Sequence, residues 1–293
     1  MLGRSLITAG VLAAALATTL ATTWDAARAF DESKYPDLKG QWIRARVPGV
    51  VGQPSYDPNH NQGRPQNPPL KPKYQAIWDA SLKDQDAGGQ GGDPTYGCLA
   101  PGMPRIMVPY GDMEIVITPE TTHILLEHIH DSRRIYTDGR TWPKDADSID
   151  PTFSGYSIGK WSDTTGNGRF DTLEVETRYF KGPRAMDASG IPLSEDNQSV
   201  FKEKIHWDQN KPDELTDEIT TFDNAFTQPW TVLKKYERRK EAQPVWFEEV
   251  CTEGNQHIGV GNEVYYLSGD GKLMPAKPGQ APPDLRFFKK SQK

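Results

Sequence analysis

Two histidines, His128 and His130, open the densest run of chemically capable side chains in the chain. Side chains alternate across a β-strand, so these two imidazoles would share one face, about 6.6–7 Å apart. They could chelate a metal ion together with His206 or Glu218 from another strand, or act without a metal as general bases. The alternative is structural: both histidines lie half exposed at a strand end and hydrogen-bond Asp131.

A basic and aromatic string follows the histidines. Its members are Arg133, Arg134, Tyr136, Asp138 and Arg140. Aspartate followed by glycine at 138–139 is typical of a turn, and its carboxylate can hold an arginine at the hairpin. An arginine beside tyrosine and histidine can instead bind a carboxylate or phenolate, with Arg105 and Trp142 as further ligand contacts. Tryptophans are more often core residues, and that alternative stays open for Trp142.

Two functions use the same predicted pocket. The first is binding of a small, largely apolar molecule, which can carry an aromatic or acidic group. The second is a lyase, isomerase or hydrolase in which His128 or His130 is the general base and Arg134 or Tyr136 stabilises an oxyanion, with Asp138 in the same site. A third hypothesis, a purely structural envelope protein, predicts no pocket. The sequence has no serine nucleophile elbow, His-Glu-x-x-His helix, phosphate-binding loop or dinucleotide fingerprint, which argues against the common hydrolase, metalloprotease and nucleotide-binding classes.

A twelve-residue segment, 163–174, has oxygen-bearing side chains at the spacing of an EF-hand calcium loop. The candidate calcium ligands are Asp163, Thr165, Asn167, Asp171 and Glu174. Calcium needs oxygen ligands wrapped around a sharp glycine turn, and a glycine stands at 168. The flanks are strand-like rather than helical, so the alternative is a Gly-Asn-Gly hairpin turn. Bound calcium would be structural rather than catalytic.

The first 29 residues are typical of a secretory signal peptide. A short basic start is followed by an apolar run from Leu6 to Leu20, and Ala27-Arg28-Ala29 is a cleavage signal. We therefore expect a periplasmic or secreted protein. The apolar run is too short for a membrane-spanning helix, and no later segment is apolar enough. A formal net charge of −6 makes a basic nucleic-acid-binding surface improbable.

The chain has two cysteines, Cys98 and Cys251. In an oxidising compartment an even pair predicts a disulfide. The bond would close a loop of about 150 residues and contribute about 4–5 kcal/mol by restricting the unfolded chain. The alternative, two free or catalytic thiols, has no supporting Cys-x-x-Cys motif.

Short alternating segments separated by turn residues predict an all-β fold. The segment 170–180 alternates as a half-buried strand, and three more strands at 199–207, 214–222 and 230–239 form a meander. The apolar spacing over Lys73–Lys83 predicts one short helix after Pro72. We expect one antiparallel, barrel-like domain over residues 30–258 with long loops, large enough to enclose a small ligand, and a peripheral tail over 259–293.

Several motifs extend this prediction by resemblance. Gly40-Gln-Trp42 is similar to the start of lipocalin-type barrels, where the tryptophan closes one end. Cys-x-x-Pro-Gly-Met-Pro-Arg at 98–105, Arg-Arg-Ile-Tyr-Thr-Asp-Gly-Arg at 133–140, and the motifs at 155–161, 171–177 and 250–255 occur in this order in a widespread group of exported bacterial proteins. The resemblance implies a β-barrel-like fold and a cysteine pair rather than a reaction. The group usually has a shorter hairpin at 163–174, so this loop resembles an insertion.

Overall fold

The computed structural model describes residues 30–50, 55–128, 131–145, 148–241, 243–247, 251, 257–260 and 263–284. The chain divides into two units, which meet between Lys34 and Tyr35. In the first unit the described residues form a single 3-10 turn, η1 (Glu32–Lys34). Everything below concerns the second unit.

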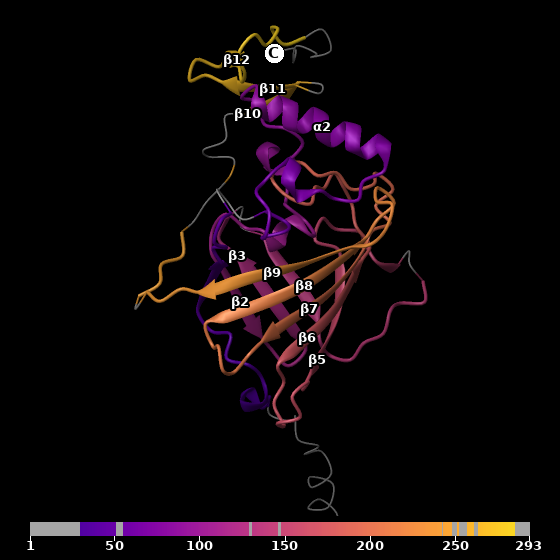
Figure 1. Cartoon of the computed structure of the whole chain (residues 1–293), viewed down its shortest axis with the longest axis vertical. Coiled ribbons are helices and arrows are strands. Elements are labelled where there is room, and N and C mark those ends of the chain that lie inside the picture. Colours follow the sequence, from indigo (N-terminus) through magenta and orange to yellow (C-terminus); the bar gives the residue numbers. More distant parts are fainter. Residues whose placement is uncertain are drawn as a thin grey trace, which may run out of the picture. The chain divides into compact units, whose positions relative to one another are not determined.

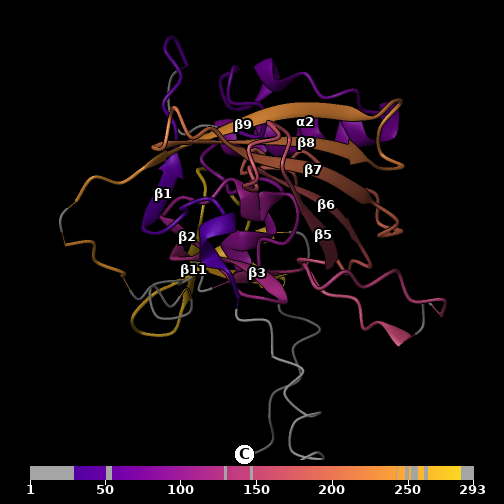
Figure 2. The same ribbon diagram turned by 90° about the horizontal axis from the view of Figure 1, so that it is seen from below.

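Nine strands form a closed barrel in sequence order (Figure 1). They are β1 (Gln41–Arg44), β2 (Met113–Ile117), β3 (Thr121–Leu126), β4 (Ser132–Tyr136), β5 (Tyr156–Ser162), β6 (Thr172–Arg178), β7 (Val200–Trp207), β8 (Glu214–Phe222) and β9 (Trp230–Arg238). The barrel closes where β1 pairs with β9, and Figure 2 shows β5 to β9 curving around one side. The prediction of a largely all-β, barrel-like fold is confirmed.

The expectation of a strictly antiparallel sheet is wrong at one place. Strands β4 and β5 run parallel, with Ile135 opposite Ser157. Parallel neighbours need a long crossover instead of a hairpin. Residues 137–155 form this crossover: they connect the end of β4 to the start of β5, which lies at the same end of the barrel as the start of β4. All other neighbouring pairs in the barrel are antiparallel.

Alternation along the strands separates the inside of the barrel from its outside. In β7, Phe201 and Ile205 are buried, whereas Lys202 and Lys204, which lie between them in the sequence, are exposed. The same rule holds in β8, where Leu215 and its alternate neighbours are buried. Burial of one apolar face per strand is what fixes the register, because a slip of one residue would expose that whole face.

Loop residues fill the barrel from within. The Tyr236 hydroxyl donates to the backbone oxygen of Met107, 2.8 Å away, in the 3-10 turn η4 (Arg105–Met107). The Tyr56 hydroxyl lies 2.7 Å from that of Thr221 at the far part of β8. Trp42, which the resemblance places at a closed end, is fully buried. Side chains from the strands and from the loops therefore pack against one another in the described part of the barrel interior.

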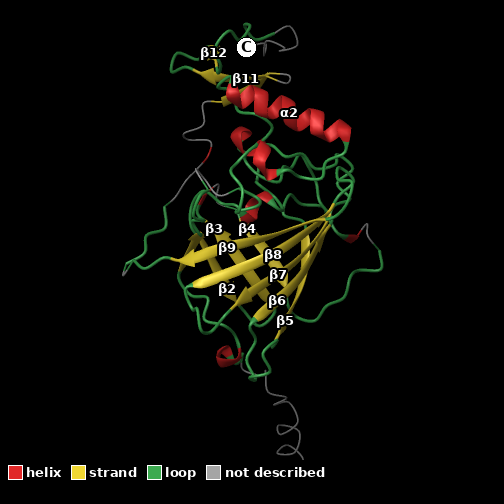
Figure 3. Cartoon of the chain, viewed as in Figure 1, coloured by secondary structure: helices red, strands yellow, loops and turns green. Residues whose placement is uncertain are grey.

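One helix of fifteen residues, α2 (Pro72–Asp86), covers the loops at one end of the barrel (Figure 3). Proline at its first turn is favourable because that position has no helical hydrogen bond to lose. Trp78 and Leu82 are buried, and the Trp78 indole donates to the Ser189 hydroxyl at 3.1 Å. Two further 3-10 turns, η2 (Arg64–Gln66) and η3 (Pro94–Gly97), lie in the loops on either side.

The two cysteines, Cys98 and Cys251, form a disulfide, as predicted. Beyond it, β10 (His257–Val260), β11 (Glu263–Leu267) and β12 (Leu273–Pro275) form a separate three-stranded sheet. This sheet begins two residues before the predicted tail, 259–293, and otherwise lies within it. Lys277 joins this region to α2 through an ion pair with Asp84. In the described ranges no helix is long and apolar enough to cross a bilayer.

Candidate functional site

The predicted site residues occupy three separate places, and the first is on the outer surface beside β5. Arg140 pairs with Asp138 (Nη2–Oδ2 2.6 Å), donates to the Tyr156 hydroxyl at 2.9 Å and places its guanidinium carbon 3.7 Å from the centre of the Tyr136 ring. The hydrogen bonds from Arg140 lower the pKa of Asp138 to about 2. Asp138 therefore holds Arg140 in the loop through a charge-assisted contact.

Trp142 extends this cluster. Its ring packs against Tyr156 and Tyr179, with centroids 6.1 and 5.9 Å away, and the Arg178 guanidinium lies 4.6 Å from its centre. Both arginines thus lie against aromatic rings, where the ring quadrupole stabilises the cation. The cluster holds the long loop against the start of β5.

An open groove of about 720 Å³ runs from Trp142 over the outer face of β5 to β8. One row across its floor alternates in charge, with Lys160, Glu174, Lys204 and Glu218 opposite one another on successive strands. Cross-strand neighbours of opposite charge stabilise the sheet. The row is close to neutral, so it favours no particular ion.

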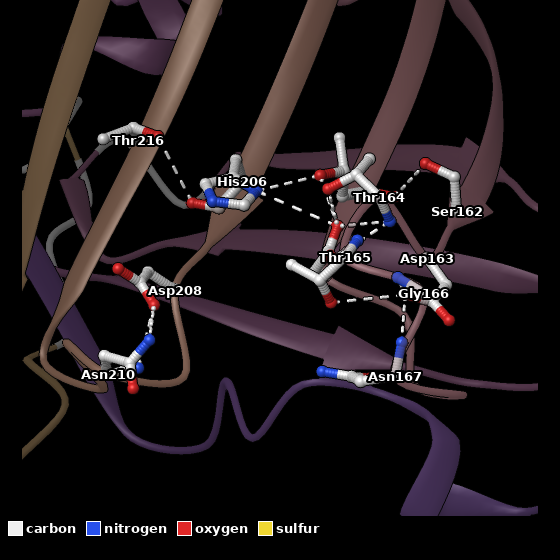
Figure 4. Close-up of polar contacts among 12 residues, drawn as sticks. Ser162, Asp163, Thr164, Thr165, Gly166, Asn167, His206, Asp208, Asn210 and Thr216 are labelled. Atoms are coloured by element: carbon white, nitrogen blue, oxygen red, sulfur yellow. Dashed lines mark hydrogen bonds and ion pairs between the residues drawn. The ribbon is translucent and has the colours of Figure 1, made fainter.

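The 163–174 loop turns its carboxylates toward its own backbone. Asp163 accepts the N–H groups of Gly166 at 2.6 Å and Asn167 at 3.2 Å (Figure 4). It also accepts the N–H of Gly168 at 2.7 Å. These backbone bonds, the one from Gly168 foremost, lower the pKa of Asp163. Asp171 accepts the backbone N–H of Thr164 at 3.0 Å. This is the bonding of a tight hairpin turn.

Four of the five side chains predicted as calcium ligands, all but Glu174, make hydrogen bonds within the loop, the Thr165 hydroxyl donating to Asp163 at 3.3 Å. Asn167 accepts from the backbone of Arg169, while Glu174 lies on β6 at the groove. His206, one proposed third ligand for the histidines, lies 2.9 Å from the Thr172 hydroxyl (Figure 4). No cluster of three histidine, cysteine or acidic side chains suited to a metal occurs among the residues described. Calcium binding stays a prediction, and the hairpin-turn interpretation accounts for the bonds seen.

The second place is the barrel interior, where Arg133 is fully buried. It donates to Glu203 Oε1 at 2.8 Å and to the Thr177 hydroxyl at 2.9 Å. Asp217, also inside, has no hydrogen-bond partner for either carboxylate oxygen in the described part of the chain, and burial with the nearby Glu203 raises its pKa well above the ordinary value. Burial lowers the pKa of Lys234 there. Arg133 therefore belongs to the core and is not available to a surface ligand.

The third place surrounds Tyr110. The guanidinium carbons of Arg105 and Arg44 lie 4.7 and 5.4 Å from its ring centre, and His128 packs edge-on at 5.3 Å. Arg105 also forms a buried ion pair with Asp93 (Nε–Oδ2 3.1 Å). Two predicted residues, Arg105 and His128, are thus brought together by an aromatic ring that the sequence did not single out.

The other two members of the opening stretch are not in this group. His130 lies outside the described residues. Arg134 is exposed on β4, opposite His123 on β3. Strand β3 ends at Leu126, before His128. His128 therefore lies beyond the strand on which it was predicted, and its pairing with His130 stays a prediction.

A pocket of about 630 Å³ opens beside Tyr110, and we call it the arginine pocket. Its lining residues are Ile43, Arg44, Arg46, Val47, Pro48, Val50, Pro58, Pro109, Tyr110, Gly111 and Arg239. Three of these are arginines and none is acidic. Arg239 pairs with two carboxylates that do not line the pocket, Asp112 (Nε–Oδ1 3.0 Å) and Glu241 (Nη1–Oε1 3.6 Å). Arg44 and Arg46 therefore supply most of the positive charge of the pocket. Burial, and to a lesser extent the neighbouring Arg105, lower the pKa of Arg44 to about 10.

A small cavity of about 10 Å³ adjoins the arginine pocket through Arg44 and Tyr110, which border both. Arg105 and Asp187 also line it. Such a volume holds roughly one water molecule. The Nη2 group of Arg105 is buried without a hydrogen-bond partner among the described residues, so the deep end of this region still offers a donor.

Sequence reasoning missed Arg44, Arg46, Tyr110 and Arg239. The one available signal was Arg44-Ala-Arg46, two arginines at strand spacing that would share a face. Nothing local shows that β1 pairs with β9, which is what brings Arg239 to the same place.

Together these features define a closed β-barrel with a surface pocket beside its first strand. The charged residues of this pocket are arginines, and its other walls are largely apolar. No protein-family model, curated protein or solved structure matches the chain.

Proposed function

We propose that the protein binds a small amphipathic anion, an apolar body carrying a carboxylate or phenolate, in the arginine pocket. The observation that carries the proposal is the lining itself: three arginines, no acid, and walls that are mostly aliphatic or proline. The signal-peptide pattern, the disulfide and the shared motifs support an exported protein of the group described above.

The chemistry of the lining explains this preference. Arginine binds carboxylates through charge-assisted hydrogen bonds, which are about twice as strong as neutral ones. Desolvated guanidinium groups such as Arg44 bind an anion more strongly than exposed ones, because less water screens them. The walls around Val47, Pro48 and Val50 contribute by removing apolar ligand surface from water. The volume falls within the range of small-molecule pockets.

Binding is better supported than catalysis. The lining contains no histidine, carboxylate or cysteine that could serve as base or nucleophile. His128 contacts Tyr110 instead of lining the pocket. An enzyme acting here would therefore have to use tyrosine or arginine alone for proton transfer.

Calorimetric titration with 4-phenylbutyrate tests the proposal, with 4-phenylbutanol as the neutral probe of the same shape. We expect the acid to bind at least ten-fold more tightly than the alcohol. Arg46→Ala should weaken binding of the acid roughly ten-fold, because an exposed arginine is lost without disturbing the core.

Arg134→Ala is the matched control, since Arg134 is also exposed on a barrel strand but lies away from the pocket. It should leave the affinity unchanged. Equal affinity for acid and alcohol, or an equal effect of the two substitutions, would exclude an anion-binding role for the pocket.

A further inference from the structure

A second cavity, of about 610 Å³, lies between α2, the glycine-rich turn that follows it, the 183–192 loop and β11. Figure 1 shows α2 and β11 beside each other, away from the barrel strands. Its lining includes the apolar side chains of Ile77 and Val264 and two largely buried polar residues, Gln90 and Arg184. We call it the glutamine cavity. It shares no lining residue with the arginine pocket.

Gln90 is 8 % exposed, yet neither its amide nitrogen nor its amide oxygen has a hydrogen-bond partner among the described residues. Gln66 shows how the same chain treats another buried glutamine. Its oxygen accepts the Asp57 N–H at 2.8 Å, and its nitrogen donates to the backbone oxygens of Asp57 and His60, both at 2.9 Å. A buried amide with unmet hydrogen-bonding capacity is costly, so Gln90 indicates a missing partner.

Arg184 borders the same cavity and is 7 % exposed. Its two terminal nitrogens donate to neutral oxygens, the Met103 carbonyl and the Ser199 hydroxyl, each at 2.9 Å. Its Nε has no partner in the described structure. Asp223 reaches it only through the Ser199 hydroxyl, and burial lowers the pKa of Arg184 to about 10. This guanidinium therefore has one unused donor and no direct counter-ion.

The charged side chains at the rim are occupied with one another. Lys277 pairs with Asp84 and, at 3.1 Å, with Glu263. Asp84 also accepts the N–H of Gly91. These groups therefore do not pair with Arg184, whose guanidinium carbon lies 4.0 Å from the centre of the Phe180 ring and whose charge is balanced only at longer range by Asp223 and Asp196. They tie the C-terminal sheet to α2 beside the cavity.

Two glycines keep the floor of the cavity closely packed. A Cβ on Gly190 would lie 2.9 Å from the Cα of Gly92, and Gly190 has a positive φ of 77°. Only glycine allows the two loops to approach this closely without strain. Gln90 and Arg184 are thus presented from two loops that are held together.

The unused groups specify a ligand. The Gln90 amide needs one acceptor and one donor in its plane, and Arg184 Nε needs an acceptor, preferably anionic. A peptide group supplies an N–H and a C=O, and a neighbouring carboxylate supplies the anion. We infer that the glutamine cavity binds a short peptide or an N-acyl amino acid, with its side chain against Ile77 and Val264.

The probe is N-acetyl-leucine, compared with 4-methylpentanoate, which lacks the amide, and N-acetyl-leucinamide, which lacks the carboxylate. Because N-acetyl-leucine is itself an amphipathic anion, titrations are made on the Arg46→Ala protein as well as on the native chain. We expect binding of N-acetyl-leucine in both, and at least ten-fold weaker binding of each comparison compound to the Arg46→Ala protein.

Gln90→Met separates this site from the arginine pocket. It should weaken N-acetyl-leucine binding at least ten-fold in the Arg46→Ala background and leave 4-phenylbutyrate binding to the otherwise native chain intact. Its thermal midpoint should stay the same or rise, since no hydrogen bond to the protein is lost. Gln66→Met should lower the midpoint, because satisfied bonds are broken.

Two results would overturn the inference. One is that N-acetyl-leucine binds somewhere else, shown either by loss of binding in Arg46→Ala or by unchanged binding in Gln90→Met. The other is no binding of any of the three compounds together with a raised midpoint in Gln90→Met, which would mean that the cavity holds ordered water only. Neither result counts against the arginine pocket, whose own test uses 4-phenylbutyrate.

Discussion

At the scale of single residues, the carboxyl of Asp217 has the most unmet hydrogen-bonding capacity among the described residues of the barrel strands. Its side chain is fully buried, and both carboxylate oxygens lack a hydrogen-bond partner within the described ranges. Lys234 on the neighbouring strand does not neutralise it directly, because its ammonium donates to the backbone oxygen of Tyr56 at 2.7 Å. A carboxyl in this position is stabilised by holding its proton.

Asp217→Asn should therefore stabilise the protein increasingly as pH rises. The pKa of Asp217 is higher in the folded protein than in the unfolded chain. The protonated carboxyl therefore contributes its full stability below the unfolded pKa, and the native protein loses this stability as pH rises toward the folded pKa. The advantage of the variant should grow by about 1.4 kcal/mol per pH unit above 3.8, until the carboxyl ionises in the folded protein. Urea denaturation between pH 4 and 8 measures it.

Glu218→Gln is the control, because this neighbour on β8 is exposed on the outer face. Its stability relative to the native chain should vary little with pH. If Asp217→Asn behaves in the same way, then Asp217 is ionised in the folded protein and the interior is more polar than its packing indicates.

At the scale of elements, the 163–174 loop shows how one motif can serve two structures. The acidic and glycine positions suit a calcium loop in sequence, but between two antiparallel strands the carboxylates accept backbone N–H groups instead. Asp163→Ala should therefore lower the thermal midpoint by the same amount with and without calcium.

The measurement is a thermal melt in calcium and in chelator for both proteins. A midpoint that rises with calcium in the native chain, but not in Asp163→Ala, would support the calcium prediction and contradict the hairpin-turn interpretation.

The sequence predicted those elements whose pattern is local. Strands β7, β8 and β9 fall within a residue of the segments expected from alternation, and α2 contains the whole predicted helix. Turn residues bound each of them, so neighbouring hairpins follow directly. Trp42 was likewise expected at the core.

The sequence alone did not show which distant strands pair with each other. The parallel β4–β5 pair and the closure of β1 on β9 depend on contacts between distant segments. The arginine pocket depends on the same closure, which is why Arg46 and Arg239 were not anticipated. Arg105 and His128, which were predicted, contact Tyr110 beside the pocket without lining it. Arg133 was misplaced because its burial depends on the partner Glu203, seventy residues away.

At the scale of the whole molecule, the disulfide ties the η3 region, near the end of the loops, to the chain after β9. It spans 153 residues, so opening it frees a long loop in the unfolded chain. Replacing both cysteines by serine should lower the free energy of unfolding by about 4–5 kcal/mol. Guanidinium denaturation of the oxidised protein and the double variant compares the two directly. Equal midpoints would contradict the expected restriction of the unfolded chain.

The central claim, that a barrel with a packed interior binds an amphipathic anion at its surface, is tested most directly by a crystal structure with 4-(4-bromophenyl)butyrate. Anomalous scattering locates the bromine independently of the protein density. We expect the bromine against Val47, Pro48 or Val50 and the carboxylate at the guanidinium groups of Arg44 and Arg46. A bromine inside the barrel, or bound at another surface with the arginine pocket empty, would contradict the account.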